Sequence, residues 1–438
     1  MTVVTRFAPS PTGRLHVGNL QQALRNWLFA RQQGGRFLLR LDDTDQERSE
    51  ARYADAIRDD LAWFGIVPDA EERQSARFDR YEARFAALVE AGRIYPAYES
   101  AQELDLRRKV LLGRGLPPIY DRAALALGDG ERARLEADGV KPHWRFRLDH
   151  GRALQWDDLI RGLQLFDPAT MSDPVVRRAD GSWLYMLPSA IDDVELGITH
   201  VLRGEDHVSN TALQLQMFEA MGATPPRFAH AALLTGSEGK LSKRLGSLGV
   251  EHFRDAGIEP AALRALLARL GTSDAVEPLV EIGPLVDGFA FAKLGRAPAK
   301  FDEAELAQVN ARVVHQLSFG DVAERLPAGM GEAAWDAVRP NLERVADAAV
   351  WWRVIEGPVA AVEEDREYLA MAAEVAAAMP WEGDPWHALT AALKERTGRK
   401  GKALFLPLRR ALTGMDHGPD MAALLPLIGR ERAVARLS

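Results

Sequence analysis

The sequence predicts an α/β protein in which a parallel-sheet domain is interrupted by an inserted segment and followed by an all-helical region. The first observation is the order strand, loop, helix, strand within residues 2–41. The second is the weak apolar pattern of residues 92–165, which are rich in Arg, Asp, Gly and Pro. The third is the Ala- and Leu-rich helical pattern from about residue 250 onward. This length and this organisation predict roughly two to four domains.

The N-terminal elements are typical of a βαβ unit. Residues 2–8 (TVVTRFA) predict a short β-branched strand, which the following prolines end. From Leu20 the apolar residues recur with the period of a helix, and Gly34 and Gly35 end it. Residues 36–41 (RFLLRL) predict the next strand. Because a helix connects the two strands, we expect them to be parallel, with a right-handed crossover.

A second helix is expected after this strand. Thr44 or Asp45 is its predicted N-cap, and acidic residues lie near its start, where the helix dipole favours them. The helix is expected to run to Phe64 and to end at Gly65.

The α/β pattern resumes after the insertion. Residues 174–187 predict a hairpin turned at Asp180–Gly181, and residues 198–204 predict a buried strand. A helix is expected from about Thr211 to Met221, and a domain boundary near residues 295–305.

The composition is that of a globular protein with no cysteine chemistry. The chain has 438 residues, of which 47% are hydrophobic and 27% charged. The absence of cysteine excludes disulfides, thiolate zinc sites and iron–sulfur clusters. No run of about 18 apolar residues occurs, so we expect a cytoplasmic protein without a membrane partner. The net charge of −8 argues mildly against nucleic acid, although it does not report local patches.

The loop between the first strand and the first helix, RFAPSPTGRLHVGN (6–19), has the position of a phosphate-binding loop. Free amides at a helix N-terminus attract anions, Gly18 permits a close approach to the backbone, and His16 offers a donor. The prolines reduce the ordering cost of binding. The alternative is a rigid turn with a surface histidine. Neither G-x-G-x-x-G nor G-x-x-x-x-G-K-[ST] is present.

A second loop, GSEGKLSKRLGS (236–247), carries Lys240, Ser242, Lys243 and Arg244 among glycines. Such a loop can close over a polyphosphate and neutralise developing charge. Taken alone, it is more typical of a solvated basic loop.

Together these two loops resemble the two signature motifs of class I aminoacyl-tRNA synthetases, at HVGN (16–19) and KLSKR (240–244). The wider context is similar to the glutamyl-tRNA synthetase family of the bacterial type: RLDDTD, YMLPSAIDD, THVLRGEDH, LGRAPAKFD and GRKGKALFLPLRRALTG follow in order. The likeness covers nearly the whole chain. The glutaminyl relatives carry Glu-Pro-Asn-Gly where this chain reads Ser10-Pro11-Thr12-Gly13, so glutamate is the amino acid implied.

The resemblance implies a class I Rossmann-like catalytic domain with a parallel sheet, an inserted acceptor-binding subdomain and all-α C-terminal domains. The implied segments are the first catalytic half (1–91), the tRNA acceptor-binding insertion (92–165), the second catalytic half with the KLSKR loop (166–249), a helical connecting domain (250–303) and an anticodon-binding domain (304–438).

The implied reaction joins glutamate to ATP, releases pyrophosphate and transfers the glutamyl group to the terminal adenosine of tRNA. ATP with Mg²⁺ is a substrate. His16 and Lys243 are the implied catalytic residues, because both would stabilise charge on the reacting phosphate. Gly18, Asn19, Lys240 and Ser242 complete the implied ATP site, and Asn19 stands where the first signature motif has its second histidine.

The implied glutamate site needs cations for two carboxylates and one acid for the ammonium group. Arg6 and Arg203 follow strands, and a guanidinium can hold a carboxylate with two hydrogen bonds. The alternative for either arginine is a surface ion pair. Asp42 stands where the family has glutamate, and Ser189 where it often has asparagine. The full implied set is Arg6, Ala8, Ser10, Asp42, Tyr185, Ser189 and Arg203.

No zinc is expected in the insertion. The family often has a Cys-x-Cys site there, but this chain has Ala97 and Glu99 at the two positions. Asp192 and Asp193 are expected to orient neighbouring side chains or to cap a helix rather than to act as catalytic acids.

A basic segment near the C-terminus is the expected contact for the tRNA backbone. Its implied tRNA-binding residues are Lys394, Arg399, Lys400, Lys402 and Arg409. A solvated helix end is the alternative. The likeness implies a monomer. The open alternatives are a glutamyl transferase that acts on another RNA or base, an enzyme that charges tRNA(Gln) or both tRNAs with glutamate, and a non-catalytic tRNA-binding paralogue.

Overall fold

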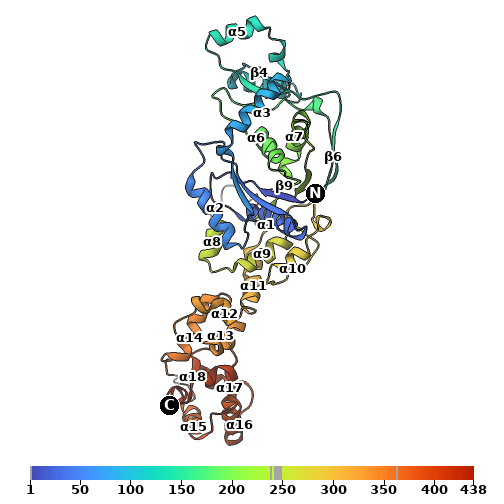
Figure 1. Ribbon diagram of the computed structural model, residues 1–438. Helices are drawn as coiled ribbons and strands as arrows, with labels where there is room; N and C mark the ends of the chain where they lie inside the picture. Colours follow the sequence, from blue (N-terminus) through green and yellow to red (C-terminus); the bar gives the residue numbers. More distant parts are fainter. Residues whose placement is uncertain (1, 237–238, 241–248, 362–363) are drawn as a thin grey trace. The chain divides into compact units, whose positions relative to one another are not determined.

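The computed structural model describes residues 2–236, 239–240, 249–361 and 364–438 (Figure 1). The chain forms two compact units. The first runs to Phe253 and adds Arg264–Val276 and Glu281–Asp302. The second comprises Arg254–Leu263, Glu277–Val280 and Glu303–Ser438. Among the described residues, no helix has both the length and the apolarity needed to cross a bilayer.

The βαβ prediction is confirmed. Strand β1 (Val4–Phe7), helix α1 (Val17–Gln32) and strand β2 (Arg36–Leu41) follow in order, and β1 pairs with β2 in parallel. Strand β3 (Ala70–Arg73) extends this sheet in parallel. Helix α1 begins before Leu20 because His16 caps its N-terminus.

A second pair of parallel strands lies beside β1. Strand β9 (His200–Gly204) pairs with β10 (Arg227–Ala231). The amide of Thr199 donates to the carbonyl of Val4 (2.9 Å), which joins this pair to β1. The predicted buried strand and the α/β class are therefore confirmed, and the carboxyl ends of β1, β2 and β9 share one edge.

The predicted start of the second helix is wrong. Helix α2 spans Ala51–Trp63, with Glu50 rather than Thr44 or Asp45 at its N-cap. The carboxylate of Asp45 instead accepts the amide of Arg48 in a turn (3.3 Å). The segment before the helix is held in extended and turn conformations, because the amide of Glu50 bonds to the carbonyl of Pro11 (3.1 Å).

The insertion is a small antiparallel subdomain. Its sheet is formed by β4 (Ile94–Ala97), β5 (His143–Phe146) and β8 (Val175–Arg177). Helices α4 (Ala101–Gly113) and α5 (Asp129–Ala137) contain no buried residue, which explains the weak apolar pattern. Strands β6 (Leu154–Asp158) and β7 (Gly162–Phe166) form a separate hairpin.

The hairpin predicted at 174–187 is only partly formed. The turn at Asp180–Gly181 is present, and Gly181 has φ +88°, the left-handed conformation that favours glycine. The second arm pairs only through a bridge between Arg177 and Trp183. Helix α6 (Met186–Glu195) then begins, so Ser189 lies on a helix.

Helices dominate the remainder, as predicted, apart from short strands near the cavity described below. The remaining helices before the second unit's main run are α3 (Phe78–Glu90), α7 (Val208–Ala220), α8 (Val250–Asp255), α9 (Pro260–Arg269) and α10 (Gly283–Asp287). The short strands are β11 (Leu234–Gly236), β12 (Gly239–Lys240) and β13 (Ala299–Lys300).

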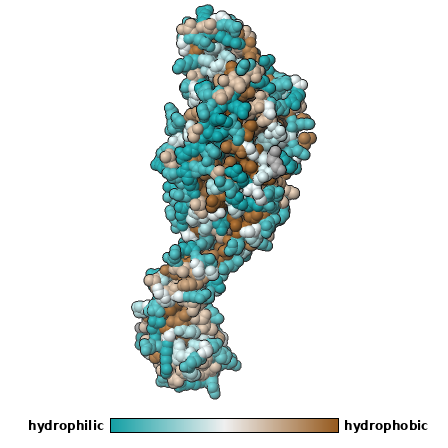
Figure 2. Space-filling model, in the orientation of Figure 1, coloured by the Kyte–Doolittle hydropathy of each residue, from teal (hydrophilic) through white to brown (hydrophobic). Residues whose placement is uncertain are grey.

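The main run of the second unit contains α11 (Glu303–Val314), α12 (Phe319–Val322), α13 (Glu332–Val338), α14 (Ala348–Glu356), α15 (Arg366–Ala378), α16 (Pro385–Thr397), α17 (Lys402–Thr413), α18 (Met421–Ile428) and α19 (Arg430–Leu437). The face shown in Figure 2 is mostly hydrophilic, with smaller groups of hydrophobic residues between.

Candidate active site

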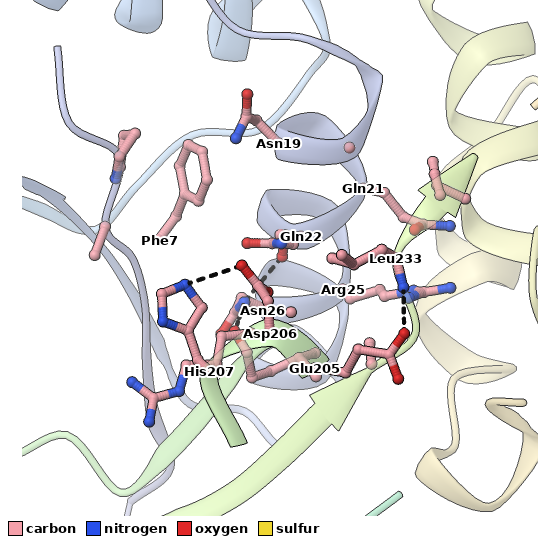
Figure 3. A pocket seen from close by; sticks show the side chains of 18 of the residues that line it. Phe7, Asn19, Gln21, Gln22, Arg25, Asn26, Glu205, Asp206, His207 and Leu233 are labelled. Carbon is pink, nitrogen blue, oxygen red and sulfur yellow. Dashed lines mark hydrogen bonds and ion pairs between the residues drawn. The ribbon is translucent and has the colours of Figure 1, made fainter. Parts of the chain in front are cut away.

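A cavity of about 840 Å³ lies in the first unit, at the carboxyl ends of β1, β2 and β9. In Figure 3, Asn19, Gln22 and Asn26 lie along helix α1, and Glu205, Asp206 and His207 come from the turn after β9. Ligands of open parallel sheets bind at this edge. The cavity is lined by every residue of the implied glutamate site and by His16, Gly18 and Asn19.

His16 is the N-cap of α1. Its Nδ1 accepts the amides of Gly18 (3.1 Å) and Asn19 (3.4 Å), and the Asn19 side chain accepts the amide of His16 (3.2 Å). We expected these helix amides to be free, whereas the histidine itself accepts two of them. Because Nδ1 is an acceptor, the proton of the neutral ring is on Nε2, which is left to donate. Desolvation lowers the pKa of His16, which favours that neutral form.

A glycine is needed at position 18 for a structural reason, in addition to the access that it gives a ligand. A Cβ at this position would lie 3.0 Å from Cε1 and 3.1 Å from Nδ1 of His16. The glycine therefore leaves room for the imidazole to fold over the start of the helix. The histidine and the glycine of HVGN form one local arrangement.

The described residues on both sides of the lysine-bearing segment lie at the cavity or next to His16. Leu234 and Thr235, on β11, line it before the segment begins. Gly249, after the segment, forms a β-bridge with His16. The backbone of Lys240 lies on β12, while Ser242 and Lys243 lie outside the described residues. The described residues on either side of the lysine-bearing segment therefore lie at or next to His16 and the cavity.

Arg6 is held by an ion pair that the sequence did not reveal. Its Nε lies 3.1 Å from Asp193 Oδ1, and both side chains are buried. Asp193 also accepts from Arg40 Nη1 (2.7 Å), so one carboxylate bridges two guanidinium groups. Burial alone would raise the pKa of Asp193, but Arg6 and Arg40 lower it below its usual value. Asp193 therefore orients its neighbours, one of the two expected roles.

Arg40 is a cavity residue that the sequence analysis missed. It lies on β2 with no exposed surface and bonds through Nε to Asp42 Oδ1 (2.7 Å) and through Nη2 to Ser189 Oγ (3.0 Å). Asp42 and Ser189 are therefore already engaged by one arginine. Burial raises the pKa of Asp42 despite this partner. The signal was an arginine at the end of an apolar run (37–39) in a strand that is followed directly by two aspartates.

Asp193→Ala should destabilise the protein by about 3–5 kcal/mol, because it leaves two buried guanidinium groups without this counter-charge. Urea denaturation followed by circular dichroism measures the loss. Asp129→Ala is the control, since the Asp129 side chain is fully exposed and no measurable change is expected. Equal midpoints for the two variants would contradict the bridging role.

Arg203, at the end of β9, makes hydrogen bonds only to neutral groups among the described residues. Its Nε donates to His230 (3.2 Å), and its Nη2 donates to Thr211 Oγ1 (2.6 Å) and Gln214 Oε1 (2.8 Å). No ion pair within 4.0 Å is found for it among the described residues. Burial, together with the nearby Arg6, lowers the pKa of Arg203 to about 10. A buried cation at a cavity wall, with no described carboxylate within ion-pair distance, is suited to receive an anionic ligand.

The remaining predicted residues of this site surround the same space. Tyr185 is the residue before α6, and its hydroxyl bonds to the amide group of Asn210. Ala8 and Ser10 lie on the loop after β1. Glu205, which the sequence did not indicate, also lines the cavity and pairs with Arg161 (2.7 Å).

Comparison with known proteins decides the family. A family model for the catalytic domain of class I tRNA synthetases (E and Q) matches residues 2–308, and a model for an anticodon-binding domain matches residues 332–438. The chain belongs to the class I tRNA synthetases of the E and Q type. The resemblance indicated by the sequence motifs is thereby confirmed.

Relatives of this synthetase are similar over its whole length. It is 66% identical to glutamate–tRNA ligase 1 of Novosphingobium aromaticivorans, with 100% of each chain covered. It is 67% identical to glutamate–tRNA ligase 1 of Rhizorhabdus wittichii, with 99% of each covered. A crystal structure of a glutamate tRNA ligase from Elizabethkingia meningosepticum, in complex with its amino acid, superposes with a TM-score of 0.87 at 28% identity, covering 100% of this chain and 98% of that one.

In this synthetase the place of the Cys-x-Cys pair is occupied by apolar packing and hydrogen bonds. Ala97 is buried in a cluster with Tyr95 and Ala124. Glu99 accepts from the Tyr120 hydroxyl (2.8 Å). Within the described residues, no three His, Cys, Asp or Glu side chains are grouped to hold a metal ion.

The basic segment of the synthetase's second unit divides into paired and unpaired cations. Arg399 pairs with Asp365 (Nη2 to Oδ1, 2.8 Å), and Arg409 donates to the carbonyl of Pro419 (3.0 Å). Lys394, Lys400 and Lys402 are exposed, and none has an ion pair in the described part of the chain. The three lysines are therefore the cations left for an external phosphate.

Proposed function

We propose that this chain is a glutamate–tRNA ligase, which activates L-glutamate with ATP and transfers it to the 3′-terminal adenosine of tRNA(Glu). The names and the high full-length identity of its relatives support this assignment. The single structural observation that carries it is Arg203, a buried cation with neutral partners at the wall of the cavity. The amino acid with an additional side-chain carboxylate is the one such a wall selects.

In this proposal Arg203 binds a glutamate carboxylate through Nη1, the nitrogen with no hydrogen bond to a described residue. Arg6, whose Nη1 likewise has no hydrogen bond to a described residue, adds positive charge to the amino-acid site. Asp42 takes the ammonium group: its two oxygens already accept from Arg40, but a carboxylate has about four lone-pair sites, so acceptor capacity remains. Because Asp42 is oriented by Arg40, the shorter side chain still has a fixed position.

The phosphate end of the site is formed by His16 and the lysine-bearing segment. His16 Nε2 donates to the phosphate of ATP as charge develops, and Lys243 and Ser242 close over it with Lys240. Gly18 and Asn19 line the adenosine side. ATP enters as its Mg²⁺ complex, whose cation offsets phosphate charge. Little covalent chemistry falls to the protein, so positioning and charge stabilisation account for the rate.

Aminoacylation with purified tRNAs tests the assignment. Glutamate should be joined to tRNA(Glu), and glutamine should not be joined to either tRNA. Charging of tRNA(Gln) with glutamate would show the wider-specificity alternative. Absence of any aminoacylation, with tRNA binding retained, would show the non-catalytic paralogue and overturn the proposal.

Purified protein should contain no stoichiometric zinc, because Ala97 and Glu99 replace the two thiolates and the neighbouring side chains are engaged with one another. Elemental analysis after dialysis without chelator measures it, and aminoacylation should withstand added EDTA when Mg²⁺ is in excess. One zinc per chain would contradict this expectation.

Lys400→Ala and Lys402→Ala should each weaken tRNA(Glu) and tRNA(Gln) binding about equally, and each should reduce the slope of log affinity against log salt by about 1. Both lysines are exposed and unpaired, so their charge is available to phosphates. Arg399→Ala is the comparison, because Asp365 already neutralises Arg399. Filter binding over a salt series measures the tRNA affinity of each variant. A larger loss of tRNA affinity in Arg399→Ala than in either lysine variant would contradict the expected order.

The proposal also includes domain boundaries at residues 91, 165, 249 and 303. It further includes a contact between the insertion and the acceptor end of tRNA, and a monomeric state. Limited proteolysis and analytical ultracentrifugation test the boundaries and the oligomeric state.

A further inference from the structure

His230, which accepts a hydrogen bond from Arg203, is itself hydrogen-bonded to Asp158, a residue of the insertion. His230, on β10, has no exposed surface, and its Nε2 accepts from Arg203 Nε (3.2 Å). On the other side of the ring, Nδ1 lies 2.5 Å from Asp158 Oδ2. Asp158 is the last residue of β6, 72 positions earlier in the chain.

The hydrogen bonds settle which ring nitrogen carries the proton. An arginine Nε–H can only donate, so His230 Nε2 must be an acceptor. The Thr211 hydroxyl, 2.9 Å from the same nitrogen, is placed to donate to it as well. The proton of the neutral ring is therefore on Nδ1, where it bonds to the Asp158 carboxylate. Burial lowers the pKa of His230, which keeps the ring neutral.

Asp158 is fixed independently of the histidine. Its Oδ1 accepts three backbone amides, from Ile160 (3.0 Å), Arg161 (2.9 Å) and His230 (3.1 Å). Although burial alone would raise the pKa of Asp158, these bonds and the bond to the imidazole hold it at about 2. One oxygen is thus committed to the turn between β6 and β7, and the other is aimed at His230.

We propose that Asp158 and His230 are positioning residues that set the affinity for glutamate, by fixing the tautomer of His230 and through it the orientation of the Arg203 guanidinium. The proposal rests on the proposed role of Arg203 in binding a glutamate carboxylate. It also means that the β6–β7 hairpin of the inserted region supports one wall of the amino-acid site. Phe228 completes this support: its ring lies under the Arg203 guanidinium (5.4 Å) and parallel to His230.

Asp158→Asn tests the tautomer directly. The three backbone amides keep the Asn carbonyl at the Oδ1 position, so the amide NH₂ faces His230 Nδ1. That nitrogen must then accept, and the ring proton moves to Nε2, where it opposes Arg203 Nε–H. We expect the KM for glutamate to rise about tenfold or more, with the KM for ATP within about twofold. Asp157→Asn, an exposed neighbour on β6, is the matched control.

Two histidine variants separate positioning from a structural effect. The Gln amide of His230→Gln reaches the position of Nε2, where its carbonyl oxygen can accept from Arg203. The shorter amide of His230→Asn reaches only the position of Nδ1, where its NH₂ group can donate to Asp158 but no acceptor faces Arg203. We expect the glutamate KM to rise more for His230→Asn than for His230→Gln. Adding Asp158→Asn to His230→Gln should cause no further rise, because no tautomer remains to be changed. The reverse ranking, or an equal further rise in the double variant, would overturn the proposal.

A spectroscopic measurement applies even if Asp158→Asn folds poorly. Long-range ¹H–¹⁵N correlation on ¹⁵N-histidine-labelled protein, assigned by the signal lost in His230→Gln, should show the Nδ1–H tautomer in the unmodified protein. An Nε2–H signal would overturn the proposal. Arg203→Ala distinguishes the proposed function of Arg203 from the proposed positioning role of Asp158 and His230. If it leaves the glutamate KM unchanged, the proposed function of Arg203 fails. If it raises that KM while Asp158→Asn does not, only the positioning proposal fails.

Discussion

Arg203→Ala should raise the KM for glutamate by about 100-fold or more, because truncating one partner of a buried charge pair costs about 2–5 kcal/mol. Arg203 is buried, and its hydrogen bonds to described residues go only to neutral groups, so no described carboxylate is paired with it at ion-pair distance. Steady-state aminoacylation at varied glutamate measures the effect. The KM for ATP should change little, because the phosphate end of the cavity is formed by other residues.

Two further variants define what Arg203 contributes. Arg203→Lys keeps the positive charge but loses the planar guanidinium and the Nε bond to His230. Its KM for glutamate should therefore lie between that of the unmodified protein and that of Arg203→Ala. Arg227→Ala removes an exposed arginine at the start of the adjacent strand β10 and should leave the glutamate KM unchanged. An unchanged KM in Arg203→Ala would remove Arg203 from the amino-acid site.

Lys243→Ala should lower the rate of glutamyl-adenylate formation by about 10²–10³-fold, the usual loss when one preorganised donor to a developing charge is removed. Lys243 lies outside the described residues, but Thr235, before its segment, lines the cavity, and Gly249, after it, forms a β-bridge with the cavity residue His16. Rapid-quench kinetics with tRNA, glutamate and ATP measures the step. Affinity for tRNA should stay nearly intact.

Lys300→Ala, which removes an exposed lysine on β13, is the control for a loss of general positive charge. It should leave the adenylate step unchanged. If Lys243→Ala lost tRNA binding together with activity, the segment would be a tRNA contact rather than part of the ATP site.

The sequence predicted those parts of the site that depend on local order along the chain. His16, Arg6 and Arg203 could be assigned because each stands at a strand end or helix start, and parallel strands bring those positions to one edge. All three line the cavity. The strand and helix types followed from periodicity, whereas the start of α2 did not, because a backbone bond from Glu50 to Pro11 overrides the local capping signals.

The parts that could not be predicted depend on pairing between distant residues. Arg40 is an arginine in a short apolar strand, and only the fold shows that Asp42, Ser189 and Asp193 surround it. The same holds for the bond between Asp158 and His230, since neither residue belongs to a recognisable motif. Buried polar groups find partners because leaving them unpaired is costly, but sequence order does not say which partner.

A crystal structure with a non-hydrolysable analogue of glutamyl-adenylate tests the central claim, that one cavity at the carboxyl ends of β1, β2 and β9 binds both glutamate and ATP. We predict a carboxylate of the analogue within about 3 Å of Arg203, and its phosphate-like group in hydrogen-bond range of His16 Nε2. An analogue bound elsewhere, or bound in the cavity without contact to either residue, would contradict the account.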